Sequence, residues 1–172
     1  MLHHRAGAGR LGALAGCVGG AGSLRGVALM PPPYRFGSRS LAVREELTSQ
    51  LAHVVSIAIE RVDFSLLCGF RGQAEQDYLE STGASKLRWP HSRHNVAGHP
   101  RRLPTTPGVH AFDFAPYPID WTDLERFRFI AYFMRGIANG LGFDLRLGAD
   151  WRGTFTHADQ TFHDVGHVEI VP

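Results

Sequence analysis

The chain has 172 residues, which is enough for one compact domain and too few for two of ordinary size. Hydrophobic residues make up 44% of it and charged residues 20%, a composition typical of a globular protein and not of a wholly disordered one. The formal net charge is only +2, with a single lysine, so the dense basic stripe of a nucleic-acid-binding protein is missing, although a mildly basic surface suits an anionic polymer.

Residues 1–33 are dominated by glycine, alanine and arginine. They offer too little apolar surface to offset the entropy lost on ordering, so we predict a disordered tail, or a non-native extension upstream of a true start at Met30. The folded domain is expected at 34–172. A bacterial lipoprotein export signal is the alternative, because Leu14-Ala15-Gly16-Cys17 follows a basic start, but its apolar stretch is short for a signal core. No stretch reaches the ~20 apolar residues of a membrane helix, so no membrane insertion is expected.

Apolar residues recur at helical spacing from Ser40 to Arg61, which predicts one helix with a buried stripe. The run 64–67 predicts a short buried strand, and 73–81 predicts a second helix that ends before a glycine. Cys68 follows the strand. We expect it to be a buried free thiol, because the other cysteine lies in the segment that is not expected to fold.

A change of composition marks residues 85–109, where four prolines and three histidines replace the helical pattern. We predict a long loop here, and long ordered loops in compact domains are often functional. Strand-like residues return over 109–114.

The last third of the chain predicts one more helix and two more strands. The helix is expected from Thr122 to Leu141, with Thr122 as its N-cap and Glu125 completing a capping box. The strands are expected at 143–147 and 168–171. Helices grouped around a few short strands indicate a single α+β domain.

Four side chains have the chemistry of a hydrolytic metal site: His94, Asp113, Asp164 and His167. Two neutral imidazoles and one carboxylate make a three-ligand set for Zn²⁺ that leaves a fourth position open for water. Zinc lowers the pKa of such a water and polarises a carbonyl, and a further carboxylate can take the proton of the water. Asp164 precedes His167 by three residues, so a tight turn would let both reach one centre. Scattered His and Asp residues are more often ordinary surface or core residues, so spacing alone is a weak signal.

Four motifs in compatible order over roughly 35–172 make the signal specific. They are Phe-Gly-Ser-Arg-Ser-Leu at 36–41, Lys-Leu-Arg-Trp-Pro-His-Ser-Arg-His-Asn at 86–95, Ala-Phe-Asp-Phe-Ala-Pro-Tyr-Pro-Ile-Asp-Trp at 111–121, and Leu-Arg-Leu-Gly-Ala-Asp-Trp at 145–151, continued by Asp-Val-Gly-His-Val-Glu at 164–169. In these motifs the chain resembles phage endolysins of the L-alanyl-D-glutamate endopeptidase type, within the zinc peptidase family that also includes D-alanyl-D-alanine carboxypeptidases. The resemblance implies a hedgehog-like or DD-peptidase-like domain, in which helices pack on a small antiparallel sheet that carries the zinc site.

The resemblance also implies the site residues. The metal ligands of the family fall on His94, Asp113 and His167, and its catalytic acid/base, three residues before the last histidine, falls on Asp164. Arg71 takes the place of an arginine that holds the substrate and polarises its carbonyl; the alternative is an ordinary salt-bridge arginine. Substrate binding is also expected of Ser92, in the second motif.

The first histidine ligand has competitors. In the compact family motif it lies seven residues before the aspartate, whereas His94 and Asp113 are nineteen apart. A loop insertion over 96–109 explains the difference and favours His94, but His99 and His110 lie closer to the aspartate. His110, three residues before Asp113, would point to the opposite face of a strand.

The remaining histidines and the tryptophans are expected to have supporting roles. Loop positions or hydrogen bonds to a metal ligand are expected for His91, His157 and His163. Packing is expected for Trp89, Trp121 and Trp151, with a glycan-facing groove as the alternative.

These assignments predict that zinc-bound water, activated by Asp164, attacks a peptide carbonyl of the bacterial peptidoglycan stem, with L-alanyl-D-glutamate as the favoured bond. The protein would be made in the cytoplasm of the host bacterium and act on the cell wall as a monomer. One rival is a D,D- or L,D-carboxypeptidase of wall metabolism, which releases terminal D-alanine. A rival of another class is a wall-binding module that has lost catalysis, against which the retention of Asp164 beside three candidate ligands argues.

Overall fold

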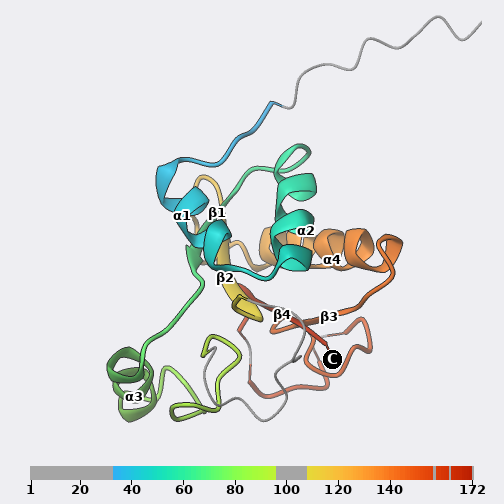
Figure 1. Ribbon diagram of the computed structural model, residues 1–172. Helices are drawn as coiled ribbons and strands as arrows, with labels where there is room; N and C mark the ends of the chain where they lie inside the picture. The colour runs from blue at the N-terminus through green and yellow to red at the C-terminus, as the bar shows by residue number, and fades with distance from the viewer. Residues whose placement is uncertain (1–32, 96–107, 157, 163, 172) are drawn as a thin grey trace, which may run out of the picture. The chain divides into compact units, whose positions relative to one another are not determined.

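The computed structural model describes residues 33–95, 108–156, 158–162 and 164–171. These residues form four helices and one antiparallel sheet of four strands in the order β1-β2-β4-β3 (Figure 1). The helices are α1 (Ser38–Glu46), α2 (Ser49–Ile59), α3 (Gln73–Ser81) and α4 (Leu124–Gly140), and the strands are β1 (Phe64–Cys68), β2 (Ala111–Pro116), β3 (Leu145–Leu147) and β4 (His167–Ile170). The predicted α+β class is confirmed. The expectations for residues 1–33 concern a segment that, apart from Pro33, lies outside the described residues.

The first predicted helix is wrong in one respect, because the structure has two helices there. Leu47 has an extended backbone and forms a parallel bridge with Val109. The amide of Val109 donates to the carbonyl of Glu46 over 2.8 Å, and the amide of Thr48 donates to the carbonyl of Val109 over 3.1 Å. Thr48 then caps α2 by accepting a hydrogen bond from the amide of Leu51. Pairing with a residue sixty positions away therefore overrides the local helical pattern.

The predicted start of α4 is also corrected. Asp123 is the N-cap, and its carboxylate accepts from the amide of Arg126. Thr122 instead donates its hydroxyl to Asp120 over 2.6 Å, in a turn that precedes the helix. Both residues are good caps in isolation, and the Asp120 turn decides between them.

The sheet has one apolar face and one polar face, because side chains alternate along a strand. On β2, Phe112 and Phe114 are fully buried in the hydrophobic core, and Asp113 between them points the other way. On β4, Val168 and Ile170 are core residues, whereas His167 and Glu169 lie on the face of Asp113. The core and the candidate site thus occupy opposite faces of the same two strands.

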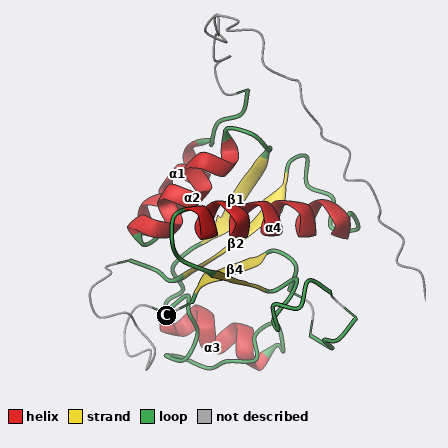
Figure 2. Ribbon diagram, turned by 90° about the vertical axis from the view of Figure 1, so that its right-hand side faces the viewer, coloured by secondary structure: helices red, strands yellow, loops and turns green. Residues whose placement is uncertain are grey.

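Three of the helices, α1, α2 and α4, cover the apolar face. α4 contacts β2 and β3, α2 packs against α4, and α1 packs against β1. In Figure 2, α1, α2 and α4 gather at one side of the strands, while α3 lies apart from them beyond β4. None of the helices in the described ranges combines the length and the hydropathy needed to cross a membrane.

Candidate metal centre

The central strands place two of the predicted ligands side by side. Asp113 on β2 is paired in register with His167 at the start of β4, so their side chains emerge together on the polar face. A tight turn precedes His167, whose amide donates to the carbonyl of Asp164 over 2.9 Å. Gly166 permits this turn, because a Cβ there would lie 2.6 Å from the carbonyl oxygen of Phe114.

The end of the second motif brings His94 to the same point. Its carbonyl accepts from the amide of Arg71 over 3.0 Å, and its Nδ1 lies 2.6 Å from the carbonyl oxygen of Gly69. Asn95 donates its side-chain amide to the carbonyl of Arg71 over 2.8 Å, and the hydroxyl of Ser92 accepts from the amide of His94. The turn that carries His94 is therefore attached to the segment after β1.

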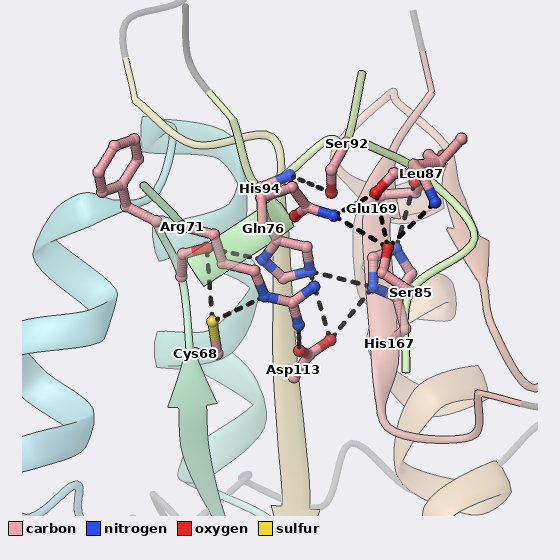
Figure 3. A network of polar contacts seen from close by, with 12 residues as sticks. Cys68, Arg71, Gln76, Ser85, Leu87, Ser92, His94, Asp113, His167 and Glu169 are labelled. Carbon is pink, nitrogen blue, oxygen red and sulfur yellow. Dashed lines mark hydrogen bonds and ion pairs between the residues drawn. The ribbon is translucent and has the colours of Figure 1, made fainter. Parts of the chain in front are cut away.

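The three side chains converge on one point, as Figure 3 shows. Nε2 of His94 lies 3.2 Å from Nδ1 of His167 and 3.4 Å from Oδ1 of Asp113, and the last two atoms are 3.1 Å apart. Tetrahedral coordination with bonds of about 2.0–2.1 Å separates neighbouring ligand atoms by about 3.3–3.4 Å. The three distances, 3.1 to 3.4 Å, are close to this separation, so the three side chains could share a metal ion.

The hydrogen-bond partners fix which ring nitrogens face one another. The carbonyl of Gly69 can only accept, so Nδ1 of His94 carries the hydrogen and Nε2 offers a lone pair. Nε2 of His167 lies 3.2 Å from Oε2 of Glu169, so it donates there and Nδ1 offers a lone pair. Two lone pairs and a carboxylate oxygen within 3.4 Å of one another repel unless a cation lies between them. The donor set is therefore built for a positive charge.

The electrostatics of the cluster agree with this conclusion. Burial alone would lower the pKa of His167, but hydrogen bonds from the ring to Asp113 and Glu169 raise it to about 9. Burial tends to raise the pKa of Asp113, yet His94 and His167 hold it well below the usual range. Without a metal, a proton occupies the place of the cation, and metal binding would displace it.

Arg71 and Cys68 lie on the other side of Asp113. The guanidinium of Arg71 forms an ion pair with Oδ2 of Asp113, which leaves Oδ1 to face the histidines, and its Nε donates to Sγ of Cys68 over 3.3 Å. A bulge in β1 between Leu66 and Cys68 aligns Cys68 with Asp113. Cys68 is a free thiol, as predicted, but it is half-buried and not buried, because the bulge turns it from the core to the polar face. Cys68, His94 and Asp113 together form a group able to hold a metal ion.

Glu169 supports the cluster from β4. Its side chain is 4% exposed, and one carboxylate oxygen accepts a hydrogen bond from His167 while the other accepts one from Arg146. The Nε of Arg93 lies 3.8 Å from the same oxygen as Arg146. Burial tends to raise the pKa of Glu169, but His167 and the two arginines hold it below the ordinary value. Glu169 is thus a charged acceptor that fixes the ring of His167.

Asp164 lies beside the cluster without belonging to it. Within the described residues its carboxylate forms no hydrogen bond or ion pair, although it feels the charges of His167, Asp113 and Arg71. Burial raises its pKa above the ordinary value. Its backbone packs against Gly148, where a Cβ would collide with the carbonyl oxygen of Asp164. A free carboxylate is therefore held at a fixed position next to the three ligand atoms.

Apart from Cys68, these groups open onto one cleft of about 540 Å³. The acidic side chains that line it are Asp113, Asp164 and Glu169, and the basic ones are Arg71, Lys86, Arg93 and Arg146. Aromatic residues line it as well, namely Phe114, Trp121, Trp151 and Phe162. Convergent charged groups in one concave cleft are the features of a ligand-binding site.

Comparison with known proteins agrees with this geometry. The family model described as phage L-alanyl-D-glutamate peptidase matches residues 33–171. The L-alanyl-D-glutamate peptidase of Escherichia phage T5 is 31% identical over 146 residues, which are 80% of this chain and 98% of that protein. The chain belongs to the phage L-alanyl-D-glutamate peptidase family.

A solved structure shares the fold. The L-Ala D-Glu endopeptidase ChiX of Serratia marcescens matches with a TM-score of 0.60 at 22% identity, over 81% of this chain and 92% of that one. The resemblance inferred from the four motifs is confirmed, and so is the expectation that the chain is a peptidase.

The predicted site residues of this peptidase are placed as follows. His94, Asp113 and His167 come together, and Asp164 lies beside them in the cleft. Arg71 also lines the cleft, but its guanidinium is engaged with Asp113. Ser92 is buried, and the contact of its hydroxyl is with the amide of His94.

The two alternatives to His94 as the first histidine ligand were His110 and His99. His110 is buried just before β2, where its carbonyl accepts from the amide of Ile170 over 3.0 Å. His99, His157 and His163 lie outside those residues, and His91 is exposed in the turn before His94. Sequence reasoning did not place Cys68 at the site, because only the β1 bulge brings it there. It also missed that Glu169 contacts His167, although the position of Glu169 two residues after His167 on a strand was the available signal.

Proposed function

We propose that this chain is a zinc-dependent endopeptidase that hydrolyses the L-alanyl-D-glutamate bond of bacterial peptidoglycan stems. The observation that carries the proposal is the convergence of Nε2 of His94, Oδ1 of Asp113 and Nδ1 of His167 at tetrahedral spacing beside the unpaired carboxylate of Asp164. Membership of the phage L-alanyl-D-glutamate peptidase family supports the choice of bond.

The residues fit zinc better than other common ions. Two imidazole nitrogens and one carboxylate oxygen are the ligand set of a catalytic zinc site, whereas Mg²⁺ and Ca²⁺ prefer oxygen ligands alone. The side chain of Cys68 lies close enough to His94 and Asp113 to be an alternative third ligand, and a thiolate would again favour zinc over harder ions. When bound, zinc would supply a Lewis acid that polarises the scissile carbonyl and lowers the pKa of a water.

The chemistry assigned to the protein itself is proton transfer and positioning. We assign to Asp164 the role of general base: its free carboxylate takes a proton from the attacking water and delivers it to the leaving amine of D-glutamate. The guanidinium of Arg71 keeps Oδ2 of Asp113 occupied and presents its remaining N–H groups to the cleft, where they can donate to the substrate carbonyl. Ser92, at the wall of the cleft, positions His94 and is assigned a contact with the peptide.

Digestion of purified cell walls tests the proposal. Mass analysis of the released fragments should show peptides that begin with D-glutamate and glycan that keeps L-alanine. Treatment with a chelator should abolish release, and added zinc should restore it. Release of terminal D-alanine would point to the carboxypeptidase alternative, and binding to walls without hydrolysis would point to the inactive module. Activity that survives complete removal of metal would contradict the zinc assignment.

A further inference from the structure

We propose that Trp121 is the platform on which this enzyme binds the sugar ring that carries the stem peptide. The proposal rests on the proposed function, because it concerns the same substrate. Trp121 is 61% exposed, and it lines the cleft that contains Asp113, Asp164 and His167. The expected packing role therefore does not describe this tryptophan, since most of its surface is open to the cleft and to solvent.

A rigid aromatic stack supports Trp121 from behind. Its ring lies on that of Phe127 with the centroids 5.6 Å apart and the planes inclined by 24°. Phe127 is fully buried and in turn packs against the buried ring of Phe114, with the centroids 5.8 Å apart. One face of the indole is thus anchored to the core, and the ring cannot fold away without losing this packing.

The loop that carries Trp121 is held by hydrogen bonds at both ends. Arg126 donates its guanidinium to the carbonyls of Tyr117 and Pro118, and Asp120 accepts from the amide and the hydroxyl of Thr122. An exposed tryptophan on such a fixed loop loses little conformational entropy when a ligand covers it. A preorganised surface of this kind favours binding.

The other aromatic rings of the cleft are already engaged. Trp151 stacks on Phe162 and lies 5.3 Å from the ring of His167, with the guanidinium of Arg146 above it. The ammonium group of Lys86 lies over the ring of Phe162, 5.8 Å from its centroid. Within the described part of the chain, the contacts of the Trp121 ring with other rings and with cations are limited to Phe127. Trp121 therefore has a ring face that no other described ring or cation covers and that a ligand can contact.

The chemistry of the substrate identifies what covers that face. In peptidoglycan, L-alanine is joined through a lactyl group to an amino sugar, so only two residue-length units, about 7 Å, separate the scissile carbonyl from the sugar. A sugar must therefore lie close to the metal ligands whenever an intact wall stem is cut. The C–H face of a pyranose ring is apolar and packs on an aromatic face, whereas its hydroxyl and acetamido groups remain in water.

The test compares two substrates that contain the same bond. One is a disaccharide carrying the stem peptide, and the other is the free stem peptide without sugar. With Trp121→Ala, we expect kcat/KM on the disaccharide-peptide to fall about tenfold, the factor that corresponds to 1.4 kcal/mol. On the free peptide it should change less than twofold. Trp121→Phe, which keeps an aromatic face, should recover most of the loss.

Phe129 provides a matched control. It is also 61% exposed and stacked on another ring, Phe133, but it does not line the cleft. Phe129→Ala should leave both substrates unaffected. Equal losses on both substrates with Trp121→Ala, or no loss on either, would overturn the sugar platform. Failure of the wild-type protein to cut either substrate would instead contradict the proposed function, so the two ideas fail separately.

Discussion

Replacing Glu169 with glutamine should weaken zinc binding although it barely changes the shape of the side chain. In the wild-type protein one carboxylate oxygen accepts from Nε2 of His167 and the other accepts from Arg146, with Arg93 also near it. Glutamine has only one acceptor oxygen. If the arginines keep that oxygen, the amide N–H₂ group faces Nε2 of His167, which must then give up its hydrogen. The hydrogen moves to Nδ1, where the zinc should bind.

The expected magnitude follows from the contact that is lost. A hydrogen bond to a charged group contributes roughly 1.5–3 kcal/mol. This range corresponds to a zinc dissociation constant roughly 10- to 150-fold higher. This range overlaps the ~10- to 100-fold loss of metal affinity or activity that usually follows when the hydrogen-bond partner of a metal-bound histidine is removed.

A competition titration against a chromophoric zinc chelator measures the effect. Thermal unfolding of the metal-free protein should show whether the variant still folds. The double variant Glu169→Gln with Arg146→Met is the informative control, because only Arg93, 3.8 Å away, then competes for the amide oxygen, which can turn toward His167 and restore part of the affinity. An unchanged zinc dissociation constant in Glu169→Gln would refute the argument, since the ring of His167 would then not depend on Glu169.

Three further predictions concern ligands, base and backbone. His94→Ala should lose zinc and activity, whereas His110→Ala should keep most of both; elemental analysis that gave the reverse would move the ligand to His110. Asp164→Asn should keep zinc and fold but lose turnover at least ~100-fold, and Asp164→Glu should retain some activity; release of zinc from the Asn variant would make Asp164 a ligand. Gly148→Ala should displace the Asp164 turn and lower kcat without unfolding the domain; wild-type kcat in this variant would show that the turn tolerates the shift.

Much of the fold was predictable because local pattern and tertiary structure agree in most segments. The helix at 73–81 has the bounds that the sequence predicted, and the strand at 64–67 is extended by one residue. The break at Leu47 was not predictable, since it depends on pairing with Val109, which lies on the far side of a long loop. The same limit explains the cap of α4: the sequence predicted Thr122, but a turn with Asp120 engages the hydroxyl of Thr122, and Asp123 caps the helix.

The site was predictable in part, through its motifs and not through spacing. Strand alternation could indicate that Asp113 points away from the core, and a turn of three residues could indicate that Asp164 and His167 lie together. The nineteen-residue separation of His94 from Asp113 could not be resolved from spacing. In the structure, contacts to Gly69 and Arg71 settle where the His94 turn lies, and both residues belong to a segment distant in sequence.

The arrangement also explains how a cluster of charges is maintained on a small domain. The backbones of the two proposed histidine ligands are hydrogen-bonded into the fold: His94 with Arg71, and His167 with Asp164 and Gly148. Because the apolar side chains of the same strands are buried on the opposite face, the core can stabilise the sheet without constraining the chemistry on the polar face. A slip of one residue in the pairing of β2 with β4 would reverse both faces at once. The register that buries Phe112 and Phe114 is therefore the register that brings Asp113 to His167.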